Sequence, residues 1–173
     1  MLVTASGVRL HTHDSDSASA PAIDATQRSG FMTLMALGRA PDAFAEGVQE
    51  FGIINWFTMH ETSDPQLTQY LVALLGDPVK DKAHYDASSP MAYIRQAKSP
   101  LLSLQGENDI RVPRGQAQEV TDILKEKGTT SETIFYPAEG HGFMKIENRL
   151  DALRRTILWF DTYLKGEAPS AMK

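Results

Sequence analysis

Residues 100–143, which read PLLSLQGENDIRVPRGQAQEVTDILKEKGTTSETIFYPAEGHGF, decide the fold of this chain. Residues 100–105 are a short apolar run closed by glycine, as expected for a parallel strand that is covered on both faces. Residues 116–127 place their apolar side chains on one stripe of a helix, and residues 132–136 form the next strand. A strand, a helix and a strand in this order predict a βαβ unit with a right-handed crossover.

The flanking segments extend this pattern in both directions. Apolar residues at helical spacing predict helices over residues 30–39, 65–75 and about 147–164. Residues 47–55 suit a further strand, and no internal repeat is visible. The alternation of helices with short apolar strands indicates an α/β protein built on a parallel sheet.

Composition excludes several classes of partner and chemistry. A chain of 173 residues and 19.1 kDa fits one domain, and 17 basic against 22 acidic residues, without a basic run, argue against nucleic-acid binding. No apolar run reaches the roughly 18 residues of a membrane span, and the N-terminus lacks the pattern of an export signal. We therefore expect a cytoplasmic protein without a membrane partner. The absence of cysteine excludes thiolate metal sites and a cysteine nucleophile.

The two ends of the chain differ from its middle. Residues 1–29 are rich in Ser, Ala, Asp and Thr and have no periodicity, so we expect a low-complexity, disordered segment, then a domain over residues 30–166 and a tail over 167–173. This first segment also contains closely spaced side chains of types that bind metal ions, namely His11, His13, Asp14 and Asp16. Because a solvated polar tail is the more common interpretation of such a stretch, we predict no metal and no cofactor.

Two loops of the βαβ unit carry candidate catalytic groups. Asp109 lies in GENDIRVP after the first strand, and His141 lies between two glycines in PAEGHGF after the second. Because parallel strands end at one edge of the sheet, these loops are expected to meet there. A histidine so placed can serve as a general base while the aspartate holds its Nδ1 proton. The alternative is a turn-forming Asp and a structural His, but their order on successive strands favours catalysis.

Several stretches of residues 30–166 resemble a known family, in the family's own order. They include GFMTLMALGRAPDAFAEGV, YDASSPMAYI, SPLLSLQGENDIRVPRGQ and YPAEGHGFMKIENRLD. They are similar to the C-terminal part of the catalytic domain of the prolyl oligopeptidase family of serine peptidases, which has an α/β-hydrolase fold. The resemblance implies that Asp109 is the triad acid and His141 the triad base of an enzyme that cleaves short peptides. It implies neither a metal nor an organic cofactor.

The nucleophile motif departs from the family pattern. The family has GxSxGG before FMT, whereas this chain reads ATQRSGFMT. Without a gap, Gln27 takes the serine position; with two residues lost, Ser29 becomes the candidate nucleophile on a shortened turn. Residues 1–29 also lack the strands expected before this turn. The resemblance therefore implies a partial α/β-hydrolase fold, with C-terminal parallel strands and flanking helices, in which the N-terminal half of the sheet is missing.

Two functional hypotheses follow. The first is a serine-type peptidase with a Ser-Asp-His triad and a peptide substrate, impaired here by its missing nucleophile elbow. The alternative is a non-catalytic truncated remnant that at most binds another chain or forms a homo-oligomer through exposed sheet edges. The state of the nucleophile elbow distinguishes the two hypotheses.

Overall fold

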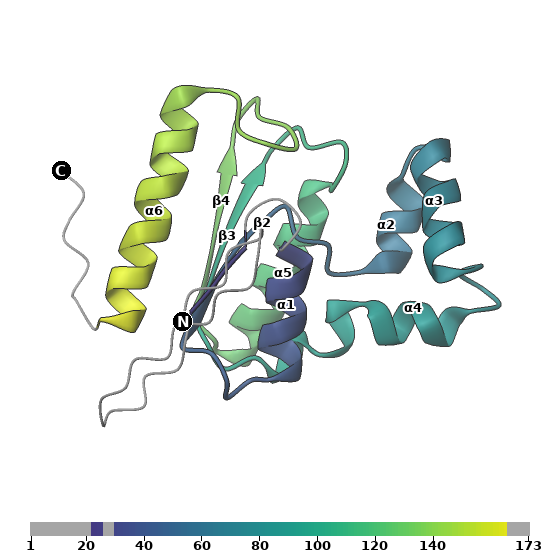
Figure 1. Cartoon of the computed structure of the whole chain (residues 1–173), viewed down its shortest axis with the longest axis horizontal. Helices are drawn as coiled ribbons and strands as arrows, with labels where there is room; N and C mark the ends of the chain where they lie inside the picture. The colour runs from purple at the N-terminus through teal and green to yellow at the C-terminus, as the bar shows by residue number, and fades with distance from the viewer. Residues whose placement is uncertain (1–21, 26–29, 166–173) are drawn as a thin grey trace.

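The computed structural model describes residues 22–25 and 30–165, and its centre is a four-stranded sheet (Figure 1). Every neighbouring pair of strands is parallel, and the strands follow one another in chain order. The strands are β1 (Ala22–Ala25), β2 (Glu46–Glu50), β3 (Leu101–Gly106) and β4 (Ser131–Tyr136). The predicted α/β class with parallel strands is therefore confirmed, and all four strands end at the same edge of the sheet.

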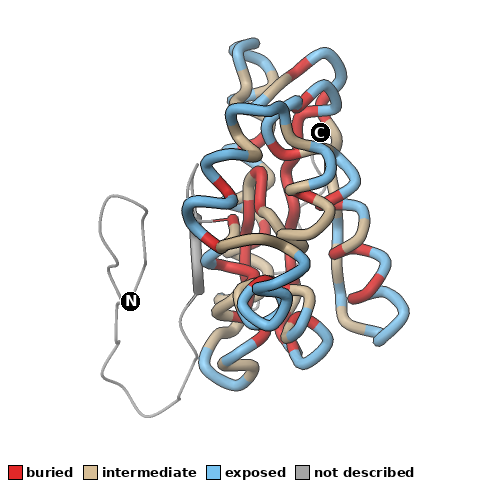
Figure 2. The backbone as a smooth tube through the Cα atoms, turned by 90° about the vertical axis from the view of Figure 1, so that its right-hand side faces the viewer, coloured by how far each residue is buried: buried red, intermediate tan, exposed pale blue. Residues whose placement is uncertain are grey.

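Helices cover both faces of this sheet. In Figure 1, α1 (Gly30–Arg39) and α5 (Arg114–Lys127) lie on one side of the strands, and α6 (Ile146–Leu164) lies on the other. Leu101 of β3 belongs to the apolar cluster with α1 and α5, whereas Leu102 belongs to the cluster with α6. Alternate residues of β3 thus enter opposite cores, and Figure 2 shows continuous burial along the central strands. This explains why the strand reads as an uninterrupted apolar run.

The chain between β2 and β3 forms a helical excursion beside the sheet (Figure 1). Its elements are α2 (Trp56–Thr62), α3 (Pro65–Leu75), α4 (Lys82–Ser88) and two 3-10 turns, Pro90–Ala92 and Ile94–Gln96. Asp64 caps α3 by accepting hydrogen bonds from the amides of Gln66 and Leu67. Met59 of α2 and Leu71 of α3 pack against Val112, which follows β3. The excursion is thereby attached to the loop that carries Asp109.

The structure matches the predicted elements closely in the βαβ unit and corrects them at β2. The helices expected over residues 30–39 and 65–75 have those bounds. The strand expected over residues 47–55 instead ends at Glu50, because Phe51 adopts a positive φ of 54° and turns the chain. At Gly30, an added Cβ would lie 2.4 Å from the carbonyl oxygen of Glu50, so glycine permits α1 to start against this turn.

One strand was not predicted from the sequence. Ala22–Ala25 lies in the segment expected to be disordered, yet it pairs in parallel with Glu46–Gln49 as β1. Four residues carry too little periodicity to predict a strand, and here the pairing with β2 supplies the backbone hydrogen bonds. The rest of residues 1–29 and the tail 167–173 lie outside the described residues. Among the described helices, none is long and apolar enough to cross a membrane.

Candidate active site

The loops after β3 and β4 meet beyond the carboxyl ends of these strands, at the top of the sheet in Figure 1. Nδ1 of His141 lies 2.9 Å from Oδ2 of Asp109, so the structure brings the two predicted residues into direct hydrogen bonding. The Asp109 side chain is fully buried, whereas about one third of the His141 side chain, 34%, is exposed. The pair therefore has a buried acid and an imidazole that solvent or a substrate can reach.

The Asp109 carboxylate is held by hydrogen bonds at both oxygens. Oδ1 accepts from the backbone amides of Arg111 at 2.8 Å and Val112 at 2.9 Å, and Oδ2 accepts from Nε2 of Gln105 at 3.0 Å as well as from His141. Burial raises the pKa of Asp109, but the hydrogen bonds from His141, Val112 and Arg111 outweigh it and hold the pKa below its ordinary value. An ionised carboxylate only accepts hydrogen bonds, so Nδ1 of His141 is the donor in this pair.

Phe51 forms a wall beside the imidazole. Its ring centroid lies 5.0 Å from that of His141 and 5.1 Å from that of Phe143, and the Phe51 side chain is buried. The positive φ of Phe51 lets the chain turn at the end of β2, where the ring reaches the histidine. Within residues 22–25 and 30–165, Nε2 of His141 forms no hydrogen bond, and it remains available to a reacting group.

The acid and base loops approach each other so closely that a side chain would not fit between them. At Gly106, an added Cβ would lie 2.2 Å from the carbonyl oxygen of Gly140 and 2.7 Å from that of Glu139. The amide of Asn108 donates to the Glu139 carbonyl at 2.8 Å, which joins the two loops through their backbones. The glycine that closes β3 is therefore required by the meeting of the loops.

Comparison with known proteins places this geometry in a family. The prolyl oligopeptidase family matches residues 29–167, which is more than half of the chain. The chain belongs to the prolyl oligopeptidase family.

Relatives with both sequence and structural similarity agree with this assignment. Dipeptidyl aminopeptidase BIII of Pseudoxanthomonas mexicana is 36% identical over 124 residues, covering 69% of this chain and 18% of the relative. The human acylamino-acid-releasing enzyme is 28% identical over 155 residues, covering 85% of this chain and 21% of the relative. The acylaminoacyl peptidase of Pyrococcus horikoshii superposes with a TM-score of 0.80 at 26% identity, covering 88% of this chain and 25% of that one. The chain thus spans about a fifth to a quarter of the length of these relatives.

Within this prolyl oligopeptidase domain, the third predicted site residue cannot be placed. Ser29, the candidate nucleophile, lies outside the described residues, as does Gln27. The histidine and aspartate pairs of residues 11–16 also lie outside them. Among the described residues, no cluster of three or more His, Asp or Glu side chains is arranged to hold a metal ion.

Two contributors to the site were missed by the sequence analysis. Gln105, the last residue before the glycine that closes β3, was assigned no role from the sequence. In the structure it is fully buried, and its Nε2 joins Asp109 to the carbonyl oxygen of Val112, 3.0 Å away. Phe51 had no recognisable signal, because its contact with His141 depends on the turn after β2. A polar residue at the end of a buried apolar strand was the one available sign for Gln105.

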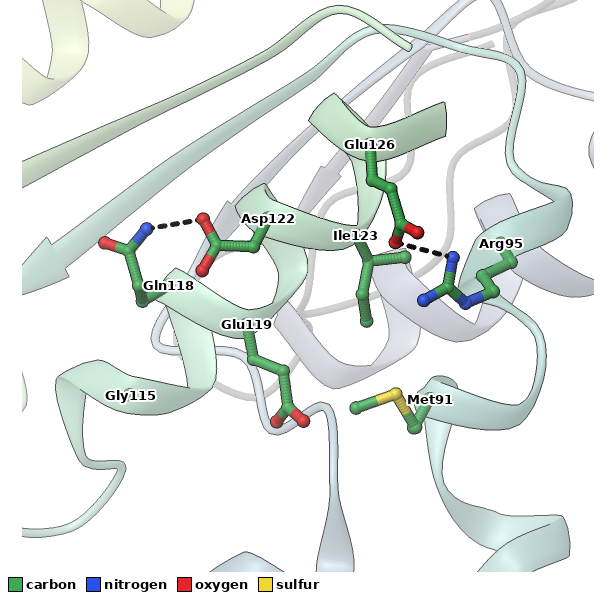
Figure 3. Close-up of a pocket in the computed structure, with 8 residues that line it drawn as sticks. All are labelled: Met91, Arg95, Gly115, Gln118, Glu119, Asp122, Ile123 and Glu126. Atoms are coloured by element: carbon green, nitrogen blue, oxygen red, sulfur yellow. Dashed lines mark hydrogen bonds and ion pairs between the residues drawn. The ribbon is translucent and has the colours of Figure 1, made fainter. Parts of the chain in front are cut away.

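A separate hollow of about 610 Å³ lies along α5 and the two 3-10 turns (Figure 3). Its lining residues are Met91, Arg95, Gly115, Gln118, Glu119, Asp122, Ile123 and Glu126. As Figure 3 shows, Arg95 pairs with Glu126 at 2.9 Å, and Gln118 donates to Asp122 at 2.8 Å. Neither Asp109 nor His141 lines this hollow, so it does not form part of the acid–base pair.

Proposed function

We propose that this chain carries the acid and base of a serine peptidase, in which Asp109 orients His141 and His141 activates a serine hydroxyl. The observation that carries the proposal is the 2.9 Å hydrogen bond from the exposed imidazole to a buried, ionised carboxylate. Membership of the prolyl oligopeptidase family supports peptides as the class of substrate. Because relatives are named as an acylamino-acid-releasing enzyme and a dipeptidyl aminopeptidase, N-acylated amino-acid amides and dipeptide amides are the first substrates to test.

The proposed chemistry requires two proton transfers through Nε2 of His141. The imidazole takes the proton of the serine hydroxyl while the serine oxygen bonds to the scissile carbonyl carbon. The imidazolium, stabilised by Asp109, then gives this proton to the leaving amine as the carbon–nitrogen bond breaks. Water attacks the resulting ester with the same base, which releases the acid product and restores the serine.

Ser29 is the nucleophile that this sequence offers, and we infer that it is a poor one. The family motif supplies glycines on both sides of its serine, whereas Ala25 and Ser29 take two of those glycine positions when the motif is aligned without a gap. Placing the nucleophile at Ser29 removes both of these glycines from the turn. A nucleophile turn needs unusual backbone angles that glycine adopts most easily. We therefore expect turnover far below that of a complete family member, with residual activity from binding and orientation.

Labelling with a serine-directed fluorophosphonate tests the proposal. The wild-type protein, Ser29→Ala and His141→Ala are labelled and the modified residue is identified by mass spectrometry, with His84→Ala on α4 as the matched histidine control. A label on Ser29 that is lost in the first two variants and kept in the control supports the peptidase. If none of the proteins is labelled, the peptidase proposal is overturned and the non-catalytic remnant is favoured. The specific observation for the remnant is that Gln27 takes the serine position when the motif is aligned without a gap.

A further inference from the structure

Glu139 is a buried acid that lies two residues before His141. It takes no part in the proposed catalytic steps. The residue is only 1% exposed, although a glutamate in a loop is ordinarily solvated. A carboxylate removed from water must be compensated by hydrogen bonds or charges. The groups that compensate Glu139 therefore indicate what the residue does.

The Glu139 carboxylate binds the chain on the far side of His141. Oε2 accepts from the amide of Met144 at 2.8 Å, and Oε1 accepts from the amide of Lys145 at 3.0 Å and from Nδ2 of Asn148 at 2.6 Å. The loop leaves Glu139, passes through His141, and returns to the same carboxylate. Both ends of the segment that holds the imidazole are thus fixed to one side chain.

The same residue also binds the acid loop. The Glu139 carbonyl oxygen accepts the amide of Asn108, the residue directly before Asp109. In addition, α6 begins at Ile146, and its N-cap residue Lys145 provides no capping side chain. Glu139 consequently connects three pieces of structure: the acid loop, the base loop and the start of α6.

The carboxylate is ionised in this setting. The amide of Met144 and the side chain of Asn148 outweigh the effect of burial and, with the amide of Lys145, lower the pKa of Glu139. A negative charge near the start of α6 is also favoured by the positive end of the helix dipole. The bonds that close the loop are therefore present throughout the neutral pH range.

We propose that Glu139 is a positioning residue that holds the backbone of residues 140–145 in the one arrangement in which His141 reaches Asp109. This inference rests on the proposed acid–base role of the pair, and it assigns Glu139 no contact with substrate. Other contacts also reach this loop, because Phe51 packs against His141 and Phe143, but its two glycines, with Gly142 at a φ of 119°, leave its backbone able to adopt other conformations. Without the carboxylate, the imidazole has several accessible positions and spends only part of its time bonded to Asp109.

Nuclear magnetic resonance of the histidine rings tests this proposal without requiring turnover. The protein is labelled with ¹⁵N, and the Nδ1 proton of His141 is followed in the wild type, Glu139→Gln, Asn148→Ala and the control Glu147→Gln, an exposed acid in the first turn of α6. We expect a resolved Nδ1 proton in the wild type and in the control. In Glu139→Gln, the amide group places N–H donors against backbone donors, so this resonance is lost through exchange with water.

The outcomes separate the positioning role from the peptidase proposal. A folded Glu139→Gln with the wild-type Nδ1 resonance overturns the positioning role. If that variant does not fold, Asn148→Ala replaces it: accelerated exchange of the Nδ1 proton supports the role, and unchanged exchange overturns it. If the wild-type protein lacks the Nδ1 resonance, the hydrogen bond between Asp109 and His141 is itself contradicted. If the resonance is present in the wild type and lost in Glu139→Gln, but fluorophosphonate labels no residue, the positioning role is supported and the peptidase proposal is rejected.

Discussion

Two buried carboxyl groups, at opposite ends of the sheet, have opposite ionisation. Asp109 follows β3 at the carboxyl end, and hydrogen bonds from His141, Val112 and Arg111 hold its pKa below the ordinary value despite its burial. Glu46 begins β2 at the amino end, is fully buried, and has no hydrogen-bond partner at either carboxyl oxygen within the described part of the chain. Burial, together with the negative charge of Asp161, raises the pKa of Glu46 to about 8.

The difference lies in what the surrounding backbone can donate. Asp109 stands in a turn whose amides are unpaired by the sheet, so Arg111 and Val112 can turn toward its side chain. Glu46 stands in a strand, where the amides take part in the ladder with neighbouring strands and cannot serve a carboxylate. Burial without hydrogen-bond donors, beside the negative charge of Asp161, therefore raises the pKa of Glu46. A turn with free amides instead keeps the buried Asp109 carboxylate ionised, so that it can hold a histidine.

Removing the supported acid should have the largest effect. Asp109→Ala leaves the amides of Arg111 and Val112 without their acceptor, and it removes one acceptor of Nε2 of Gln105, which keeps the carbonyl oxygen of Val112. We expect the free energy of unfolding to fall by about 3 kcal/mol or more, because each buried donor without a partner costs about 1–3 kcal/mol. Urea denaturation followed by circular dichroism measures this change. A loss below about 1 kcal/mol would mean that the turn does not depend on the carboxylate.

Removing the unsupported acid should have the opposite sign. Glu46→Gln eliminates ionisation while keeping the shape of the side chain. Between the ordinary pKa of 4.5 and the folded-state pKa of about 8, rising pH ionises the unfolded chain first and so destabilises the wild type. The stability gain of the variant should be negligible near pH 4.5 and grow to a value on the order of 3 kcal/mol at pH 8.

Thermal melts between pH 4.5 and pH 8 check this prediction, with the exposed Glu61→Gln as the matched control. The difference between Glu46→Gln and the wild type should widen with pH, whereas the control should remain parallel to the wild type. A constant difference across this range would show that Glu46 is already ionised in the folded protein.

A smaller effect on the free energy of unfolding is expected at the end of β4, where an uncharged hydroxyl donates a hydrogen bond to another carboxylate. The hydroxyl of Tyr136 donates to Oδ2 of Asp151 at 2.8 Å, and Arg155 binds the same oxygen at 2.7 Å. Since Arg155 still satisfies the carboxylate, Tyr136→Phe should lower the free energy of unfolding by only about 1 kcal/mol. A loss above about 3 kcal/mol in denaturant titration would show that the tyrosine hydroxyl supports more of the fold than this single bond.

The sequence predicts the framework of the site better than its supporting contacts. The βαβ pattern of residues 100–143 is sufficient to place Asp109 and His141 at one edge, because parallel strands end together. Local patterns could not assign roles in the site to Gln105, Phe51 and Glu139, because each of these residues acts through a contact with another loop. The strand β1 was missed for a related reason: its four residues are ordered by pairing with β2 and not by their own periodicity.

An ionised Asp109 should hold the Nδ1 proton of His141, and the ring ¹⁵N spectrum of His141 at neutral pH measures where that proton lies. The wild-type protein is compared with Asp109→Asn, whose amide removes the charge at nearly constant size. We predict that the wild type has the proton on Nδ1, and that the variant shifts this proton toward Nε2 because its carboxylate acceptor is gone. Identical tautomers in the two proteins, or a wild-type ring protonated at Nε2 alone, would mean that the Asp109 carboxylate does not hold the Nδ1 proton.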